Sequence, residues 1–209
     1  MKKTIFLATA LTVCMLGAND MFAQVRETTH YDDGSYYTGQ RDARGKRNGD
    51  GMMVFASGDR YEGQWKKGVM TGEGTYYWAD GLVYKGQWKN NVINGEGTFR
   101  FPNGNVMEGT WTGLGTGTGT LTWADGTRYE GPFVNGAPHG KGVKVWKDGS
   151  RYEGNFNYGH ISGQGKMIYA DGSNYEGSWL NDMYEGKGKF INAEGVVLEG
   201  NFHQGVHQE

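Results

Sequence analysis

A fixed repeat of 23 residues runs through most of this chain. The pattern Tyr-Glu-Gly-x-Trp, then Gly-x-Gly, then Asp-Gly starts at Tyr61 and returns at Tyr84, Met107, Tyr129, Tyr152, Tyr175 and Leu198. Such a period is typical of a repeat array, in which each unit packs mainly on its neighbours. The repeat therefore argues against a compact single core. An array of this kind offers a binding surface, but the repeat pattern does not identify the ligand.

Each unit is predicted to form two short antiparallel strands. From Tyr61 to Trp65, odd-numbered residues face one side of a strand and even-numbered residues the other. A second alternation through Tyr76 leads into the loop Ala79-Asp80-Gly81. A two-residue loop there would split the large rings between two faces, whereas a three-residue loop sets Tyr84 opposite Tyr76 and keeps them together.

The fold class predicted is all-β: an elongated, single-layer antiparallel meander of about seven to eight stacked hairpins. The large rings share one face, and the glycine two residues after each repeat tyrosine makes room for them. We interpret the ring face mainly as core, with a ligand groove as the alternative. The candidate binding face is Tyr84, Trp88, Phe99, Phe101, Trp111, Trp123, Trp146 and Trp179.

The N-terminus has the layout of a secretory signal. Lys2 and Lys3 precede an apolar stretch that ends near Leu16 and is too short to span a membrane. We expect residues 1–23 to be removed, with cleavage after Ala18 as the alternative. Cys14, the only cysteine, lies inside this segment; lipidation there is a second alternative, opposed by the large residue that precedes it. We therefore expect an exported protein in the periplasm, at the cell surface or in the medium.

The remaining chain divides into an N-terminal linker (24–36), the repeat array (37–205) and a C-terminal tail (206–209). The full chain has 21 Lys and Arg against 23 Asp and Glu; removal of Lys2, Lys3 and Asp20 leaves 19 against 22, with no basic run. This balance argues against nucleic acid as a partner and gives little support to electrostatic binding of anionic lipid.

No motif for catalysis, a cofactor or a metal stands out. The glycine-rich run from Gly113 to Gly119 lacks the strand before and helix after that a phosphate loop requires. His203 and His207 have helical ligand spacing, but they fall on a strand and a tail. The glutamates that follow the repeat tyrosines recur in every unit but one, which indicates a solvated face more than an acid/base pair. We expect no enzyme, no cofactor and no metal.

The repeat resembles the MORN (membrane occupation and recognition nexus) motif. The residues that carry the likeness are Tyr61-Glu62-Gly63-Gln64-Trp65, Gly72-Glu73-Gly74 and Asp80-Gly81, and it extends from about Tyr37 to Gly205. Arg41 in place of the tryptophan and Glu194 in place of the turn aspartate are departures at the ends. The resemblance implies a β-meander that serves as a scaffold for protein association or membrane contact.

We therefore expect an exported, non-enzymatic scaffold with an unidentified protein partner and a membrane contact as a further option. The alternative is a module that binds a glycan or lipid headgroup with the aromatic groove. The strand from Leu198 to Phe202 has no covering element in this reading, so Leu198, Gly200 and Phe202 form a candidate homodimer edge. The competing outcome is a tail that folds over this edge.

Overall fold

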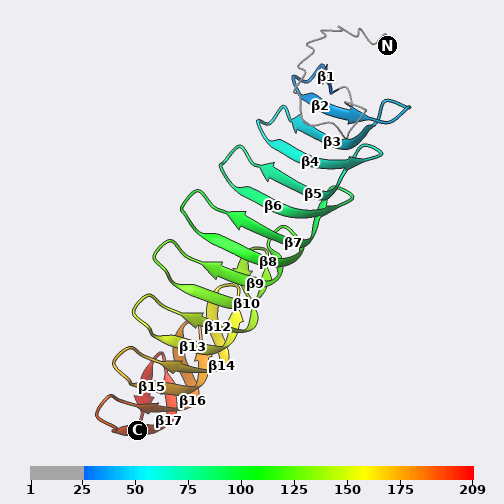
Figure 1. Cartoon of the computed structure of the whole chain (residues 1–209). Coiled ribbons are helices and arrows are strands. Elements are labelled where there is room, and N and C mark those ends of the chain that lie inside the picture. The colour runs from blue at the N-terminus through cyan, green and yellow to red at the C-terminus, as the bar shows by residue number, and fades with distance from the viewer. Residues whose placement is uncertain (1–25) are drawn as a thin grey trace, which may run out of the picture. The chain divides into compact units, whose positions relative to one another are not determined.

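The computed structural model describes residues 26–209, which form two compact units, residues 26–91 and 92–209. The expected signal, residues 1–23, with Cys14 inside it, lies outside the described residues. Each unit is an antiparallel meander, in which each strand pairs with the next along the chain (Figure 1). The all-β meander predicted from the repeat is confirmed. In the described part of the chain no helix has the length and apolar character needed to cross a bilayer.

The first unit contains β1 to β6. Their bounds are β1 Glu27–His30, β2 Tyr36–Arg41, β3 Arg47–Val54, β4 Arg60–Lys66, β5 Val69–Tyr77 and β6 Val83–Lys89. β1 lies in the segment expected to be a linker, and it pairs with β2 from Glu27 opposite Gly39 to His30 opposite Tyr36. The missed signal is Asp33-Gly34, which forms the same loop as the later Asp-Gly pairs, with Gly34 at φ 85°.

The second unit contains β7 to β18. Their bounds are β7 Val92–Arg100, β8 Val106–Gly113, β9 Thr116–Thr122, β10 Arg128–Val134, β11 Ala137–Pro138, β12 Gly140–Val145, β13 Arg151–Asn157, β14 His160–Ile168, β15 Asn174–Leu180, β16 Met183–Ile191, β17 Val197–His203 and β18 Val206–Gln208.

The predicted register of the Asp-Gly loops is confirmed. Tyr84 lies opposite Tyr76, and the Trp78 amide donates to the Leu82 carbonyl across the loop at 2.9 Å. Gly81 takes φ 91°, a conformation that favours glycine. At the other end of the hairpins two-residue turns join the strands, as at Lys67-Gly68 with φ 54° and 92°. Positive φ at both positions is the signature of a type I′ turn.

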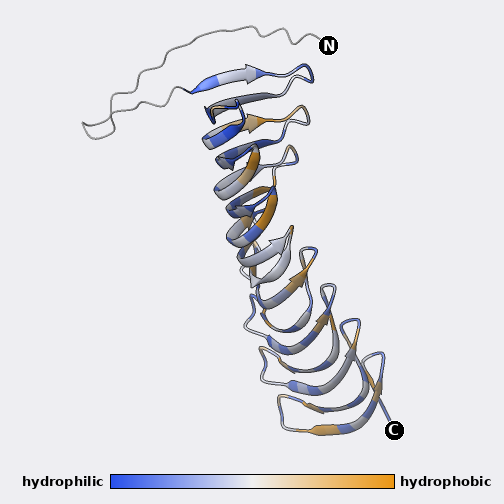
Figure 2. Ribbon diagram, turned by 90° about the vertical axis from the view of Figure 1, so that its right-hand side faces the viewer, coloured by the Kyte–Doolittle hydropathy of each residue, from blue (hydrophilic) through white to orange (hydrophobic). Residues whose placement is uncertain are grey.

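The Gly-x-Gly motif serves two different purposes. Gly63 pairs with Gly74 and Trp65 with Met70, so β5 has a bulge of extra residues opposite Gln64. The first glycine, Gly72, takes φ 60° in this bulge, and bulges bend strands. Curved strands are plain in the second unit in Figure 2.

The second glycine lies under a tyrosine ring. A Cβ on Gly74 would come 2.2 Å from the Tyr61 hydroxyl oxygen, so no side chain fits while the ring is in place. That hydroxyl donates to the Gln64 carbonyl at 3.1 Å, and equivalent bonds recur for Tyr37, Tyr84, Tyr129, Tyr152 and Tyr175. The prediction named a different glycine, the one two residues after the tyrosine, and it holds in part: a Cβ on Gly63 would come 2.6 Å from the Tyr61 hydroxyl oxygen, whereas one on Gly109 would meet only backbone atoms.

The core of each unit is the ring layer. Tyr61 is fully buried, with its ring centroid 5.1 Å from that of Trp65 and 5.4 Å from that of Trp88 in edge-to-face contacts. The indole N–H of Trp65 donates to the Gly51 carbonyl at 3.0 Å. The indoles of Trp88, Trp111 and Trp179 make the same bond to the carbonyls of Gly74, Gly97 and Gly165. Rings and backbone therefore hold together a sheet that has no second layer.

The C-terminal edge differs from the prediction. β18 pairs with β17 through Asn201 opposite Gln208, Phe202 opposite His207 and His203 opposite Val206. The tail thus covers the part of β17 that includes Phe202, which is only 4% exposed, whereas Leu198 is 40% exposed. The prediction of an uncovered edge through Leu198, Gly200 and Phe202 is wrong at Phe202. Gln204-Gly205 forms another two-residue turn, with φ 49° and 83°, and this turn brings the tail back alongside Phe202. The proposed homodimer loses its main premise.

Candidate interaction surface

The predicted binding face is largely core. Tyr84, Trp88, Phe99, Trp111 and Trp179 are at most 6% exposed, and only Phe101, Trp123 and Trp146 are half-buried. A buried ring cannot stack on a sugar or a peptide unless the sheet opens. The burial of these rings agrees with the interpretation of the face mainly as core and argues against the alternative, an aromatic ligand groove.

A lysine enters this ring layer, which the sequence reasoning missed. Lys144 lies opposite Tyr129 and Tyr152, and its Nζ is 4.9 Å from the centroids of both Trp123 and Trp146. Burial lowers the pKa of the Lys144 ammonium, and two aspartates oppose the shift. The signal was available, because Lys144 precedes Trp146 by two residues, as Tyr76 precedes Trp78. The cation-π contacts explain how a cation is tolerated here.

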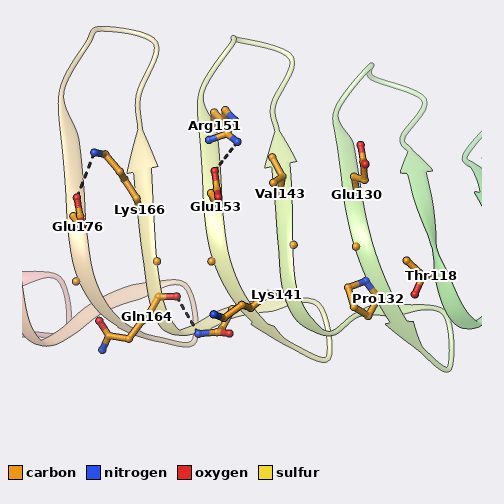
Figure 3. A pocket seen from close by; sticks show the side chains of 16 residues that line it. Thr118, Glu130, Pro132, Lys141, Val143, Arg151, Glu153, Gln164, Lys166 and Glu176 are labelled. Atoms are coloured by element: carbon orange, nitrogen blue, oxygen red, sulfur yellow. Dashed lines mark hydrogen bonds and ion pairs between the residues drawn. The ribbon is translucent and has the colours of Figure 1, made fainter.

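The opposite face of the second unit carries an open polar trough of about 850 Å³. Its floor is the glycine backbone of five neighbouring strands: Gly131, Gly142, Gly154, Gly165 and Gly177. Figure 3 shows this glycine line between two rows of side chains. One row includes Glu130, Val143, Glu153, Lys166 and Glu176, and the other Thr118, Pro132, Lys141 and Gln164.

The geometry of the trough follows from the repeat. A residue just before and a residue just after each central glycine point to the same side of the strand, so they become the two rows. The central residue itself points to the ring side, so backbone lies between the two rows whichever residue stands there. The trough is therefore a consequence of strand alternation, and the side chains of the two rows form its walls.

Charges in the trough are mixed. Arg151 Nη2 lies 2.7 Å from Glu153 Oε2, and Lys166 Nζ lies 3.3 Å from Glu176 Oε2. Glu130 pairs with Arg128 at 3.3 Å. Such exposed pairs contribute little to stability, about 0 to 1 kcal/mol each. The repeat glutamates were predicted to form a solvated face. Glu130, Glu153 and Glu176 are exposed, as predicted, but each pairs with a cation, and together they form part of one wall of the trough.

The histidines connect hairpin turns and do not converge. His160 Nδ1 lies 2.7 Å from Asp182 Oδ2, and His203 Nδ1 lies 3.1 Å from Glu185 Oε1. The pKa of the Glu185 carboxyl is lowered, first by the backbone N–H of Gln204 and then by His203. His207 instead packs its ring 5.1 Å from Phe202. Among residues 26–209, no group of three or more His, Cys, Asp or Glu side chains is placed to hold a metal ion.

Comparisons with known proteins agree with the repeat. The family model for the MORN repeat matches residues 43–60, 61–83, 84–106, 113–128, 129–151, 152–174 and 175–197. No curated protein matches the chain.

Two solved structures are similar in part. One is the TCP domain of SAS-4 (dCPAP) of Drosophila melanogaster in complex with a proline-rich motif of Ana2 (dSTIL), at 17% identity and a TM-score of 0.38, covering 78% of this chain and 96% of that one. The other is the TCP10 domain of Danio rerio CPAP in complex with a peptide of STIL, at 16% identity and a TM-score of 0.30, covering 87% and 97%. With the fold, the ring layer and the family match in hand, the chain belongs to the MORN repeat family.

Proposed function

We propose that this protein is an exported, non-enzymatic scaffold that binds a protein partner along the polar trough of the second unit. Membership of the MORN repeat family supports a scaffold for protein or membrane interactions. The observation that carries the choice of a protein partner is the trough itself, with its exposed glycine backbone and mixed charges.

The chemistry of the trough fits a polypeptide better than the other ligand classes. A glycan site needs exposed rings for stacking, and none lines the trough. An anionic lipid site needs clustered cations, whereas Lys141, Arg151 and Lys166 are balanced by three glutamates. Small-molecule sites are mostly enclosed, whereas this surface is open. A polypeptide can lie along the line of glycines and pair with side chains of both charge signs in the two rows.

A capture experiment with matched charge variants tests this function. The full chain, immobilised, is incubated with envelope and secreted fractions of the source organism, and retained proteins are identified by mass spectrometry. The trough variant Lys141→Glu/Lys166→Glu should lose a protein that the wild type retains. The control Arg100→Glu/Lys147→Glu, which makes the same charge change at exposed positions outside the trough, should keep it.

Loss of the captured protein in both variants would mean that net charge alone controls binding, and it would contradict the trough as the binding site. Retention in both would place the partner elsewhere. Retention of lipid or glycan and of no protein would contradict the proposed function itself.

A further inference from the structure

The turns of the first unit gather cations that are separate in the sequence. The loop between β2 and β3, the turn between β4 and β5, and the end of β6 contribute Arg44, Lys46, Arg47, Lys66, Lys67 and Lys89. We call these six residues the basic edge. The expectation that the chain lacks clustered cations holds along the sequence but not in the fold.

Backbone hydrogen bonds fix these turns against one another. The Gly68 amide donates to the Arg47 carbonyl at 2.8 Å, and the Asn91 amide donates to the Met70 carbonyl at 3.0 Å. Asn91 also accepts a bond from the Met70 amide at 2.8 Å. The three turns therefore follow one another along a single side of the sheet, two strands apart.

Two guanidinium groups, that of Arg47 in the basic edge and that of Arg41 opposite it in β2, are held in place by neutral groups. Arg47 donates to the Gly68 carbonyl at 3.1 Å, and its Cζ lies 4.4 Å from the Trp65 ring centroid. Arg41 donates to the Gly45 carbonyl at 2.7 Å and to the Thr29 hydroxyl at 2.9 Å. These partners orient the side chains without neutralising them, which leaves the positive charge for another molecule.

The carboxylates nearby do not offset the charge. Asp42 is the one acidic residue in the β2–β3 loop, and its Oδ1 accepts the backbone amides of Arg44 and Lys46, each at 2.9 Å. Among the described residues, no carboxylate forms an ion pair with a member of the basic edge; the first unit's ion pair, Arg60 with Glu62, lies outside it. Exposed cations without partners are available for association.

The repeat itself does not require this charge. In the second unit the corresponding turns pass through Leu114, Asn135, Tyr158, Asn181 and Gln204, and neither these residues nor their immediate neighbours are Lys or Arg. The turns fold in both cases, so the fold does not require a cation at these turns, although Arg47 also packs on the Trp65 ring.

We propose that the basic edge binds an acidic polypeptide segment in an extended conformation. Neighbouring turns are two strands, or about 9.6 Å, apart. A chain in the extended polyproline II conformation advances about 3.1 Å per residue with three residues per turn, so every third residue faces the same side and meets the next turn. A partner with a carboxylate at every third position matches the edge, and guanidinium groups bind carboxylates well.

The edge fits a polypeptide better than a bilayer. Binding to a membrane surface draws on buried apolar area as well as charge. Tyr31 is the one exposed large apolar side chain among the described residues of the first unit, and it lies in the β1–β2 loop, outside the basic edge. The inference rests on the proposed function as a protein-binding scaffold, and it adds the chemistry of a partner and a second surface.

A binding titration tests the inference. The probe is a fluorescein-labelled peptide of about a dozen residues with Glu at every third position and neutral residues between. The full chain is titrated into it and anisotropy is measured at about 10 mM and about 150 mM salt. Vesicles of phosphatidylcholine and phosphatidylserine form a second arm, and a peptide with Lys in place of Glu forms a third.

We expect the acidic peptide to bind, more weakly at the higher salt, and the lysine peptide not to bind. Lys46→Glu/Lys66→Glu should weaken binding about tenfold or more, and Lys46→Gln/Lys66→Gln should weaken it less. Lys85→Glu/Lys147→Glu has the same net charge as the first variant but lies outside the edge, and it should bind within about twofold of the wild type.

Equal loss in the control variant, no binding at low salt, or binding of anionic vesicles without the peptide would overturn the inference. The capture experiment on the trough is independent of these variants. If the peptide titration fails while the trough still captures a protein, the basic edge is rejected as a binding site and the proposed function is unaffected.

Discussion

Gly74→Ala tests whether the second glycine of the motif exists to seat a tyrosine ring. A Cβ at this position would lie 2.2 Å from Oη and 2.5 Å from Cζ and Cε2 of Tyr61. The ring cannot move aside easily, because Tyr61 is fully buried and packs edge-to-face on Trp65 and Trp88. The variant must therefore displace the ring or the strand.

The expected loss of unfolding free energy is about 2 kcal/mol, within a range of about 0.5 to 4 kcal/mol. Displacement of the ring breaks the hydrogen bond from Tyr61 to the Gln64 carbonyl, which contributes about 0.5 to 1.5 kcal/mol. Overpacking in a well-packed core adds about 1 to 3 kcal/mol. The lower chain entropy of alanine offsets about 0.5 to 1 kcal/mol of this total.

Urea unfolding followed by far-ultraviolet circular dichroism measures the loss. Gly113→Ala is the control, because a Cβ there meets nothing within 4 Å and its backbone does not require glycine. Its unfolding free energy should stay within about 0.5 kcal/mol of the wild type. In a double-mutant cycle, Gly74→Ala should cost much less in a Tyr61→Ala background. Equal effects of Gly74→Ala and Gly113→Ala would refute the assignment of the ring to this glycine.

Other expected outcomes follow from the same structure. Trp179→Phe, which removes an indole donor to the backbone, should lose about 1 to 2 kcal/mol in urea unfolding, whereas Leu180→Ala at a 49% exposed position should change little; equal losses would reverse the assignment of faces. Burial raises the pKa of Tyr129 and Tyr152 to about 12, above the unfolded value of 10, so stability should hold below pH 10 and fall as pH rises towards 12. Loss of stability well below pH 10, or no loss as the pH approaches 12, in urea unfolding at a series of pH values would contradict this. Exported protein should begin near Gln24 on N-terminal sequencing, and an intact N-terminus in the cytoplasm would refute export.

The fold was largely predictable because the repeat fixes period, register and faces together. The opposition of Tyr84 and Tyr76 followed from the need to keep large rings on one side. What escaped prediction was the bulge at Gly72, since alternation alone gives no sign of extra residues opposite Gln64. The bulge bends the strand.

The candidate sites were harder to predict because each depends on contacts between units of the repeat. The trough arises from side chains of five neighbouring strands that alternation places in two rows, and nothing local in Gly154 or Gly165 indicates it. The basic edge escaped a search for runs of charge, because Arg47 and Lys67 become neighbours only through pairing of the strands. The strand Val206–Gln208 could have been found, since Gln204-Gly205 repeats the turn pattern of Lys67-Gly68.

The central claim is that the ring side is core and that the polar trough meets a protein partner. Photo-crosslinking in the source organism tests it most directly, with p-benzoylphenylalanine placed at Gln164 in the trough or at Trp146, a half-buried position on the ring side. We predict a crosslinked protein adduct from Gln164 and none from Trp146. Adducts from Trp146 alone, or from neither position, would contradict the account.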